Sequence, residues 1–319
     1  MAAWERTRNR RYDAPVETRI YVDGTITAPE AACIPVLDHG FLFGDSVYEV
    51  LWWHHGTLIQ ETEHLDRLEA SARRLYMDVQ IPRAELVEAM QETLRAAGAA
   101  PTDDAYVRLI LTRGSGPLGL DFPGVPKRSL VIVAAPATRP SEAEFERGLK
   151  VALVDRRRMN ARALDPSAKT GNYLNNVLAL HEARLAGADE AVMLNSEGRI
   201  AEATTANVYA IRDGALATPP LEAGILRGTT RTRILELCGS LGIPASEVSL
   251  TPEAFCDADE VLLSSSVRGI LAVVEIDGRP VGDGRVGPVT RRLREAFEAA
   301  AAADVRAAQS GAGDESPGA

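Results

Sequence analysis

The apolar and polar positions of this chain predict two mixed α/β lobes joined by a polar stretch. Alternating apolar residues indicate strands, and apolar residues at intervals of three and four indicate helices. The elements expected in the first lobe, over 19–137, are an Asp-Gly hairpin, a long strand, two helices and two further strands: 19–26, the second half of 37–53, 62–77, 83–97, 105–113 and 129–135. On the long strand, alternation puts Tyr48, Val50 and Trp52 on one face.

A polar connection over 138–149 precedes a second, larger α/β lobe over 150–303. Its expected strands lie at 150–155, 190–195, 199–203, 205–211, 260–264 and 271–276, and its expected helices at 172–184, 228–242 and 287–303. The Arg-rich residues 1–18 are interpreted as an N-terminal arm. The small, polar residues 304–319 are interpreted as a disordered tail.

Length, charge and composition narrow the functional classes. With 319 residues and 45% hydrophobic content, the chain can bury one large core or two moderate ones. The net charge of −10 disfavours nucleic acid or an anionic membrane surface as a partner, but it leaves room for a local basic pocket that binds one small anion. No apolar run approaches the length of a membrane span, so we expect no membrane protein.

Cysteine and histidine usage argues against disulfides and metal sites. The widely separated Cys33, Cys238 and Cys256 are typical of reduced thiols in a cytoplasmic protein. The five histidines form no pair at the spacing of helical metal ligands, so no metal is implied. His64 lies on a predicted helix beside two glutamates, and we interpret it as a surface or capping residue.

The stretch from Asp165 to Asn176 contains the strongest candidate for covalent chemistry. Lys169 lies among small and amide residues, has no carboxylate at the next helical turn, and precedes Tyr173 by four positions. Most lysines are solvated surface charges. A lysine held among neutral groups, however, gives up its proton more easily, which suits an amine that attacks an aldehyde.

The Gly-rich segment 114–119 has the spacing GxGxxG and follows a predicted strand. A dinucleotide-binding fingerprint also requires a helix that opens directly after the glycines, and residues 120–124 cannot supply one. We therefore interpret this segment as a loop.

Three further segments allow both a binding role and an ordinary structural role. The run Gly228-Thr229-Thr230 opens a helix, where free N–H groups and hydroxyls either cradle an anion or simply cap the helix. The serines 264–266 follow an apolar strand and either bind an anion or end that strand. Glu202 stands between alanines in an apolar strand pair, so its carboxylate needs an internal arginine or a protonated ring nitrogen.

Taken together, these segments resemble the class IV aminotransferases, the fold type IV group of pyridoxal-phosphate enzymes. That group contains the branched-chain and D-amino-acid transaminases and aminodeoxychorismate lyase. The resemblance covers about residues 19–302. The segments that carry it are 38–44 with Tyr48 and Glu49, 63–68 with Ser71 and Ala72, 169–176, 202–207, 224–231 and 259–261. It implies a small N-terminal and a larger C-terminal lobe with the cofactor in the cleft between them.

The resemblance assigns cofactor-binding roles to residues of both lobes. Lys169 would hold pyridoxal 5′-phosphate (PLP) covalently as a Schiff base and then move the proton during catalysis. Glu202 would keep the pyridine nitrogen protonated, which makes the ring an electron sink. The remaining contacts would come from Arg67, Thr229, Thr230 and Ser266 to the phosphate and from Tyr173 to the phenolic oxygen.

The same resemblance implies substrate-binding residues. Those that match pocket positions or stand beside them are Tyr48, Trp52, Tyr106, Arg108, Val267 and Arg268. Phe43, Leu118 and Leu120 match loops that in this family reach the pocket of the neighbouring subunit, which implies a homodimer. Arg268 stands where branched-chain enzymes usually have a small residue, and it would either clamp the substrate carboxylate or point to solvent.

The implied reaction is ping-pong transfer of an amino group from an amino acid or primary amine to a 2-oxo acid such as 2-oxoglutarate. The glycine-rich loop and the run 172–176 favour the branched-chain type with an apolar side chain, while D-amino-acid and (R)-amine specificities stay open. Two alternatives remain. One is aminodeoxychorismate lyase, which releases pyruvate; the other is a non-catalytic binding protein, against which the set Lys169, Glu202 and Arg67 argues.

Overall fold

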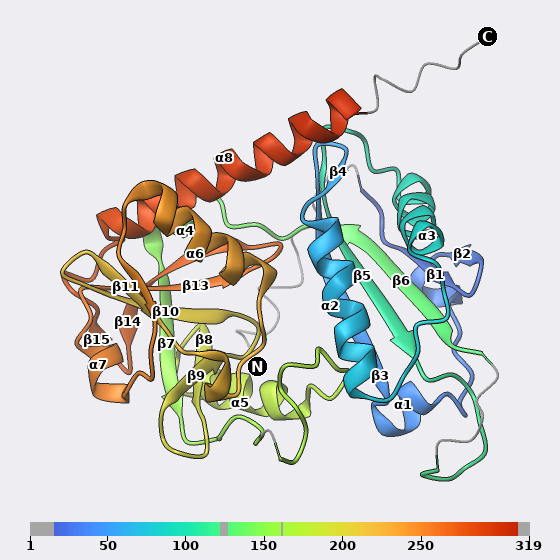
Figure 1. Ribbon diagram of the computed structural model, residues 1–319, viewed down its shortest axis with the longest axis horizontal. Helices are drawn as coiled ribbons and strands as arrows, with labels where there is room; N and C mark the ends of the chain where they lie inside the picture. The colour runs from blue at the N-terminus through green and yellow to red at the C-terminus, as the bar shows by residue number, and fades with distance from the viewer. Residues whose placement is uncertain (1–15, 122–126, 161, 312–319) are drawn as a thin grey trace.

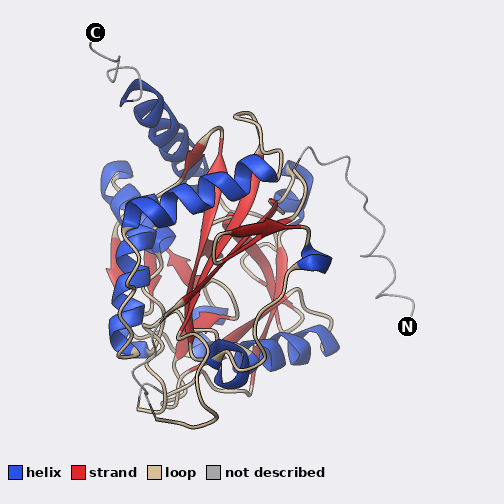
Figure 2. Ribbon diagram, turned by 90° about the vertical axis from the view of Figure 1, so that its right-hand side faces the viewer, coloured by secondary structure: helices blue, strands red, loops and turns tan. Residues whose placement is uncertain are grey.

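The molecule has two lobes, each built around one β-sheet (Figure 1). The computed structural model describes residues 16–121, 127–160 and 162–311. Figure 2 shows the strands in the interior of the molecule and most helices on its outside. The predicted mixed α/β fold with two lobes is therefore confirmed. No helix within the described ranges is long and apolar enough to cross a membrane.

The small lobe contains a six-stranded antiparallel sheet with the order β2-β1-β6-β5-β3-β4. Its strands are β1 (Arg19–Val22), β2 (Thr25–Thr27), β3 (Ser46–His54), β4 (Thr57–Leu58), β5 (Asp104–Thr112) and β6 (Ser129–Pro136). Its helices are α1 (His39–Phe43), α2 (Glu61–Arg74) and α3 (Arg83–Ala96), with a 3-10 turn over Pro29–Ala31. Every predicted element of this lobe is present, whereas α1 and the 3-10 turn are too short to show a period and were missed.

Alternation along β3 decides what each face of the small-lobe sheet contacts. Val47 and Leu51 point to the helical side, where they pack against Leu65 and Leu68 of α2 in a buried core. Tyr48 points to the opposite side, toward the large lobe. Strand β3 thereby separates the core of the small lobe from the space between the lobes.

The large lobe contains a nine-stranded mixed sheet with the order β12-β11-β10-β13-β14-β7-β8-β9, and β15 pairs with β14. Its strands are β7 (Leu149–Val154), β8 (Glu190–Leu194), β9 (Ile200–Ala203), β10 (Asn207–Arg212), β11 (Ala215–Thr218), β12 (Ala245–Glu247), β13 (Glu260–Ser265), β14 (Gly269–Ile276) and β15 (Arg279–Pro280). Its helices are α4 (Glu142–Arg147), α5 (Leu174–Leu185), α6 (Thr229–Leu241), α7 (Pro252–Cys256) and α8 (Pro288–Gly311), with a 3-10 turn over Leu221–Ala223.

A hydrophobic cluster joins the two lobes, and Trp52 is its small-lobe anchor. Trp52 and Ile59 pack in one buried cluster with large-lobe residues such as Phe297 of α8. The indole Nε1 donates to Asp104 Oδ1 at 2.9 Å, and the Arg139 guanidinium carbon lies 3.7 Å from the ring centroid. In Figure 1, α8 extends from the large lobe toward β4 of the small lobe, where the two elements are in contact.

The expectation that Trp52 lines the substrate pocket is wrong. Its side chain shares a strand face with Tyr48, as predicted, but it is 1% exposed and belongs to the cluster between the lobes. Tyr48 and Trp52 are four positions apart on the strand, or about 13 Å at ~3.3 Å per residue. Residues on one face of a long strand can therefore belong to two different environments.

The expected chain ends and connection also need correction. Val16 is 3% exposed in the small-lobe core, so the N-terminal arm does not include residues 16–18. Helix α4 occupies part of the predicted connection. Helix α8 continues through 304–311, which were expected in a disordered tail, because Val305 is buried and Asp304 pairs with Arg233 at 2.5 Å. Residues 1–15 and 312–319 lie outside the described residues.

Replacing Trp52 by alanine should weaken the attachment of the lobes. The substitution removes a fully buried indole and leaves a cavity, at a cost of about 3–5 kcal/mol in the free energy of unfolding. Chemical denaturation at fixed protein concentration measures the change. Tyr76→Ala, at a side chain that is 83% exposed, serves as the control and should change stability little. Equal stabilities of the two variants would contradict the role of Trp52.

Candidate active site

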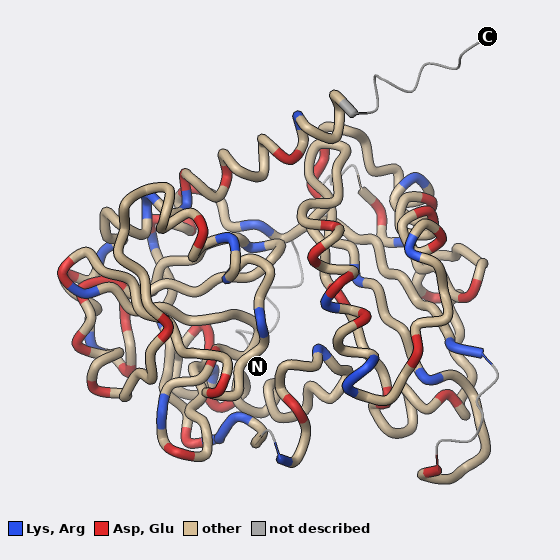
Figure 3. Tube along the Cα trace, in the orientation of Figure 1, with Lys and Arg blue, Asp and Glu red and all other residues tan. Residues whose placement is uncertain are grey.

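A cavity of about 540 Å³ lies between the two lobes. Its charged lining consists of four arginines, one lysine and two carboxylates: Arg67, Arg108, Arg158, Arg268, Lys169, Asp165 and Glu202. Figure 3 shows acidic and basic positions intermixed over both lobes, so the positive charge of the cavity is a local feature. Such a pocket in an acidic protein suits a small anionic molecule. Within the described parts of the chain, no group of His, Cys, Asp and Glu could hold a metal ion.

The small-lobe wall of the cavity comes from adjacent positions on β3 and β5. Tyr48 and Val50 lie on β3, and Tyr106 and Arg108 lie on β5, where Arg108 pairs with Val50. The Arg108 guanidinium carbon is 3.9 Å from the Tyr48 ring centroid, a cation–π distance. Burial, reinforced by neighbouring Tyr173, raises the pKa of Tyr48, so its phenol keeps its proton.

Lys169 is attached through its backbone to a helix and a strand of the small lobe. Its N–H donates to Ser71 Oγ of α2, and its carbonyl accepts from the Tyr48 N–H, both at 3.0 Å. The ammonium Nζ lies 4.4 Å from the Tyr48 ring centroid and 6.0 Å from that of Tyr173. Gly171 permits the close approach of this segment to β3, because a Cβ there would overlap a serine of the strand. The lysine is therefore directed into the cavity from a fixed backbone.

Arg67 reaches the cavity from α2 and is held there by Glu49, which points to the helical side of β3. Its Nε and Nη2 donate to the two Glu49 oxygens at 2.7 Å each. Its Nη1 donates to the Arg227 carbonyl of the large lobe at 3.0 Å. Burial alone would raise the pKa of Glu49, but Arg67 and His64 outweigh it and hold the pKa at about 2. The carboxylate therefore stays ionised at neutral and mildly acidic pH.

His64 is buried, so its interpretation as a surface or capping residue is wrong. The side chain is 1% exposed, with Nδ1 2.7 Å from Glu49 Oε2 and Nε2 3.3 Å from Thr229 Oγ1. His64, Arg67 and Leu68 share one helix face because residues three and four apart are neighbours on a helix. The adjacent Glu63 is exposed on another face of the helix, and this acidic neighbourhood in the sequence concealed the burial of His64.

The N-terminus of α6 brings unpaired donors to the cavity. Gly228 caps the helix without a side chain, and a Cβ there would overlap the side chain of Asn207. Thr229 and Thr230 occupy the first two helical positions, whose N–H groups have no acceptor within the helix. Among the described residues, the buried Thr230 Oγ1 has no hydrogen-bond partner. Together with the Arg67 N–H groups that are not used by Glu49 and Arg227, these donors match an anion such as phosphate.

Glu202 has the internal cation that its apolar setting requires. On β9, its Oε1 accepts from Arg158 Nε at 2.7 Å and its Oε2 accepts from the Leu226 N–H at 3.0 Å. The side chain lines the cavity and is 7% exposed. Sequence reasoning did not identify Arg158, because it is the last of three consecutive arginines and nothing in the pattern distinguishes it from the other two.

Arg268 lines the cavity and is held by its neighbours. Its Nη2 donates to Thr205 Oγ1 at 2.7 Å, and its Nε donates to Ser265 Oγ at 3.3 Å. The buried Glu190 lies 3.7 Å from Nη2 and accepts from the Thr204 and Thr205 hydroxyls. One third of the Arg268 side chain remains exposed, so part of the guanidinium is accessible to a ligand.

Most of the predicted site residues meet at this cavity. Those that line it are Lys169, Arg67, Glu202, Tyr173, Thr229, Thr230, Ser266, Tyr48, Tyr106, Arg108, Val267 and Arg268. Phe43, Leu118 and Leu120 do not line it and are 41%, 75% and 85% exposed. Their expected contact with the pocket of a neighbouring subunit concerns a second chain and stays a prediction.

Comparisons with known proteins identify the family. The family model described as Amino-transferase class IV matches residues 46–276. A putative branched-chain-amino-acid aminotransferase from Methanocaldococcus jannaschii is 36% identical over 280 residues, which cover 88% of this chain and 95% of that protein. A D-alanine aminotransferase from Staphylococcus haemolyticus is 34% identical over 280 residues, which cover 88% of this chain and 96% of that protein.

A solved structure shows the same arrangement of lobes. The T.th. branched-chain amino acid aminotransferase with pyridoxamine 5′-phosphate superposes with a TM-score of 0.84 at 29% identity, covering 91% of this chain and 95% of that chain. Because the relatives include branched-chain and D-alanine enzymes, the similarity does not decide the substrate. The extent of the match and the identity of these relatives show that the chain belongs to the class IV aminotransferases, a family of PLP-dependent enzymes.

Proposed function

We propose that this protein is a transaminase that holds PLP on Lys169 and moves an amino group to a 2-oxo acid such as 2-oxoglutarate in a ping-pong reaction. One cavity contains an amine, a buried carboxylate and a set of phosphate donors. These groups fit the aldehyde, the pyridine nitrogen and the phosphate of PLP. The Thr230 hydroxyl, which has no partner among the described residues, and Arg67 line the same cavity and support a phosphate site there. The presence of all three kinds of group in one cavity is the observation that carries the proposal.

When bound, PLP supplies an electron sink that stabilises negative charge at the substrate Cα. Lys169 Nζ would hold the cofactor and would act as the base that takes the proton from the substrate Cα. Its backbone is held by Ser71 and Tyr48, so only the side chain moves between these tasks. The rings of Tyr48 and Tyr173 beside Nζ exclude water from the reacting atoms.

Glu202 keeps a proton on the pyridine nitrogen. Arg158 and the Leu226 N–H hold its carboxylate as an anion in a fixed orientation, ready to accept a charge-assisted hydrogen bond. Tyr173 and Ser266 also line the cavity; Tyr173 would hold the phenolic oxygen of the cofactor ring, and Ser266 would add a hydroxyl to the phosphate site. The carboxylate and the phosphate donors thereby hold the two ends of the cofactor.

The substrate side of the cavity combines an apolar wall with guanidinium groups. Val50 and Val267 add aliphatic surface to the rings of Tyr48 and Tyr106, which favours a branched-chain amino acid as the donor. Arg268 is the clamp for the substrate carboxylate, since its fork is oriented by neighbours and remains partly accessible. This assignment replaces the alternative in which the side chain points to solvent.

The active form is a homodimer whose interface includes α1 and the start of α5. Exposed apolar side chains occupy both elements: Phe41, Phe43, Leu174, Val177 and Leu178. The residue that follows α1 is joined to the segment just before α5, because Asn172 Nδ2 donates to the Gly44 carbonyl at 3.0 Å. A second copy is the occupant that would bury this surface and bring Phe43 and the loop with Leu118 toward a neighbouring cavity.

The attachment of PLP is testable because the chain has three lysines, at 127, 150 and 169. Borohydride reduction followed by peptide mass spectrometry should locate the phosphopyridoxyl group on Lys169. Lys169→Ala should lose this adduct and lower turnover by at least about 10²–10⁴-fold, because the proton-transfer group is removed.

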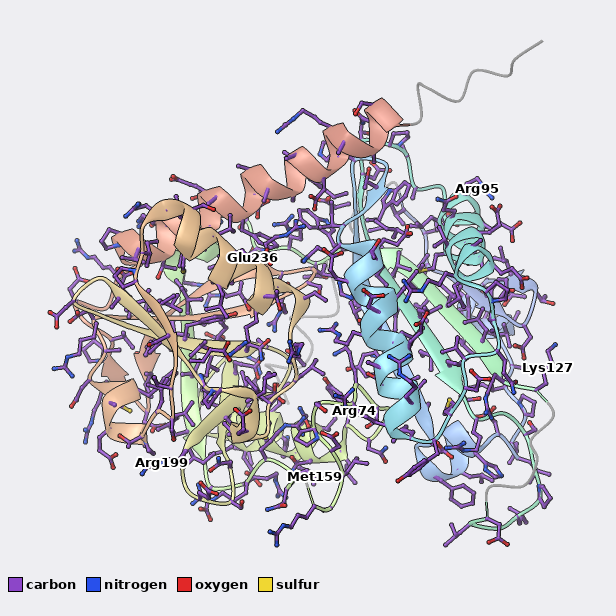
Figure 4. The ribbon with its side chains drawn as sticks, in the orientation of Figure 1. Arg74, Arg95, Lys127, Met159, Arg199 and Glu236 are labelled. Carbon is purple, nitrogen blue, oxygen red and sulfur yellow. The ribbon has the colours of Figure 1, made fainter. Side chains whose placement is uncertain are left out.

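Matched controls come from the other two lysines. Lys127 lies on the far side of the small lobe (Figure 4), and Lys150 pairs with Glu275 on the surface at 2.9 Å. Alanine at either position should leave adduct and turnover unchanged. An adduct on Lys127 or Lys150, or turnover that survives Lys169→Ala, contradicts the proposal. Pyruvate release without an amino acceptor would instead identify a lyase.

Arg268→Ala should raise the KM for amino and 2-oxo acids by about 10–100-fold, as expected for the loss of a charge-assisted hydrogen bond of about 1.5–3 kcal/mol. For an amine without a carboxylate, such as 1-phenylethylamine, the KM of the variant should equal that of the wild type. Arg199→Ala, at the outer end of the large lobe in Figure 4, is the control and should react like the wild type. An equal loss for both substrate classes would show that Arg268 supports the fold and does not recognise the carboxylate.

The proposed dimer predicts a native mass of twice the 34.2 kDa chain. Val177→Glu places a charge in the proposed interface and should shift the protein to monomers in sedimentation experiments. Val248→Glu changes an exposed valine outside that interface and should leave the mass unchanged. A monomeric wild type, or a dimer unaffected by Val177→Glu, would contradict this interface.

A further inference from the structure

His64 connects the carboxylate that holds Arg67 to the first hydroxyl of α6. The imidazole contacts Glu49 through Nδ1 at 2.7 Å and Thr229 through Nε2 at 3.3 Å. It stands directly behind the donors to which we assign the PLP phosphate. A buried, titratable ring at this place has no role in the mechanism described above.

The partners of His64 determine where its protons lie. The ionised Glu49 carboxylate only accepts hydrogen bonds, so Nδ1 must carry a hydrogen. In the neutral ring, Nε2 is then an acceptor, and the Thr229 hydroxyl donates its single hydrogen to it. In the imidazolium form, Nε2 donates instead, and the hydroxyl hydrogen of Thr229 is released toward the cavity.

We propose that His64 is a positioning residue that takes up a proton when the cofactor phosphate binds, which turns the Thr229 hydroxyl into a donor to that phosphate. A proton from the solvent bonds to Nε2, no other covalent bond of the protein changes, and the hydrogen bond between Nε2 and Thr229 reverses its direction. A phosphate dianion accepts hydrogen bonds and is repelled by a hydroxyl lone pair, so it favours the imidazolium form. The inference rests on the proposed function, because it places the phosphate at the N-terminus of α6.

The charges around His64 determine how phosphate binding and the protonation of His64 affect each other. Burial lowers the pKa of His64, Glu49 on β3 raises it, and Arg67 on α2 and Lys169 before α5 lower it, with a net lowering. The ring is therefore neutral at neutral pH without phosphate. A dianion beside Thr229 raises this pKa, so phosphate affinity falls as pH rises from the pKa of the free protein to that of the complex.

Pyridoxamine 5′-phosphate tests the coupling, because it carries the phosphate but has no aldehyde to react with Lys169. Calorimetric titration of the full chain, freed of cofactor, in buffers of different ionisation heat counts the protons taken up on binding. We expect His64→Gln to take up about one proton fewer than the wild type. The wild-type affinity should also fall with pH more steeply than that of the variant, by up to about tenfold per pH unit.

Two further variants complete the test. Thr229→Val keeps the shape of the side chain but removes the hydroxyl, so it should also lose the extra proton uptake and remains informative if His64→Gln does not fold. His55→Gln, at an exposed hairpin tip, should match the wild type. Nitrogen NMR of His64 should show Nε2 gaining a hydrogen on binding, a signal that a purely structural histidine would not give.

The outcomes separate the two proposals. Equal proton uptake by the wild type, His64→Gln and Thr229→Val overturns the role of His64 and leaves the phosphate site intact. A wild-type chain that does not bind pyridoxamine 5′-phosphate contradicts the proposed function itself.

Discussion

The guanidinium of Arg67 holds together three elements that meet at the cavity. It binds Glu49 of β3 with two parallel hydrogen bonds, belongs to α2, and donates to the Arg227 carbonyl just before α6. Glu49 is fully buried and the Arg67 side chain is 10% exposed, and leaving a buried charge without its partner costs about 3–5 kcal/mol. Because both partners of this pair belong to the small lobe, it is the hydrogen bond from Arg67 to the Arg227 carbonyl that helps to set the distance between that lobe and the N-terminus of α6. The position of the phosphate donors relative to Lys169 depends on that distance.

Much of the fold could be predicted from hydrophobic periodicity. Strand β3 and helices α2 and α5 are long enough to show several periods, and each lies within a few residues of its predicted range. Helices α1, α4 and α7 have five or six residues, which is too short for a period to be seen. The end of α8 was predicted too early because residues 304–311 are small or polar and include only one large apolar side chain, Val305. Its alanines are strong helix formers, and the ion pair of Asp304 with Arg233 adds a tertiary contact.

The sequence predicted those residues of the candidate site whose immediate neighbours in the chain reveal an unusual environment. Lys169 and Glu202 stand out because each is a charged residue among neutral neighbours, and the family resemblance supplied most of the others. The misassigned or missed residues depend on distant partners. His64 is explained by Glu49 and Thr229, the missed Arg158 by Glu202, and Trp52 by the helix α8 that covers it. The spacing of residues along the chain does not predict contacts between residues that are so far apart in sequence.

The scarcity of lysine has a chemical consequence for the whole protein. Aldehydes condense with primary amines but not with guanidinium groups, and this chain carries nearly all of its positive charge on arginine. Its surface ion pairs, such as those of Arg83 with Asp66 and Glu69, are built from a cation that is inert toward carbonyl compounds. A reactive vitamin aldehyde therefore meets few competing amines on the protein that uses it, and stray modification of the surface is kept low.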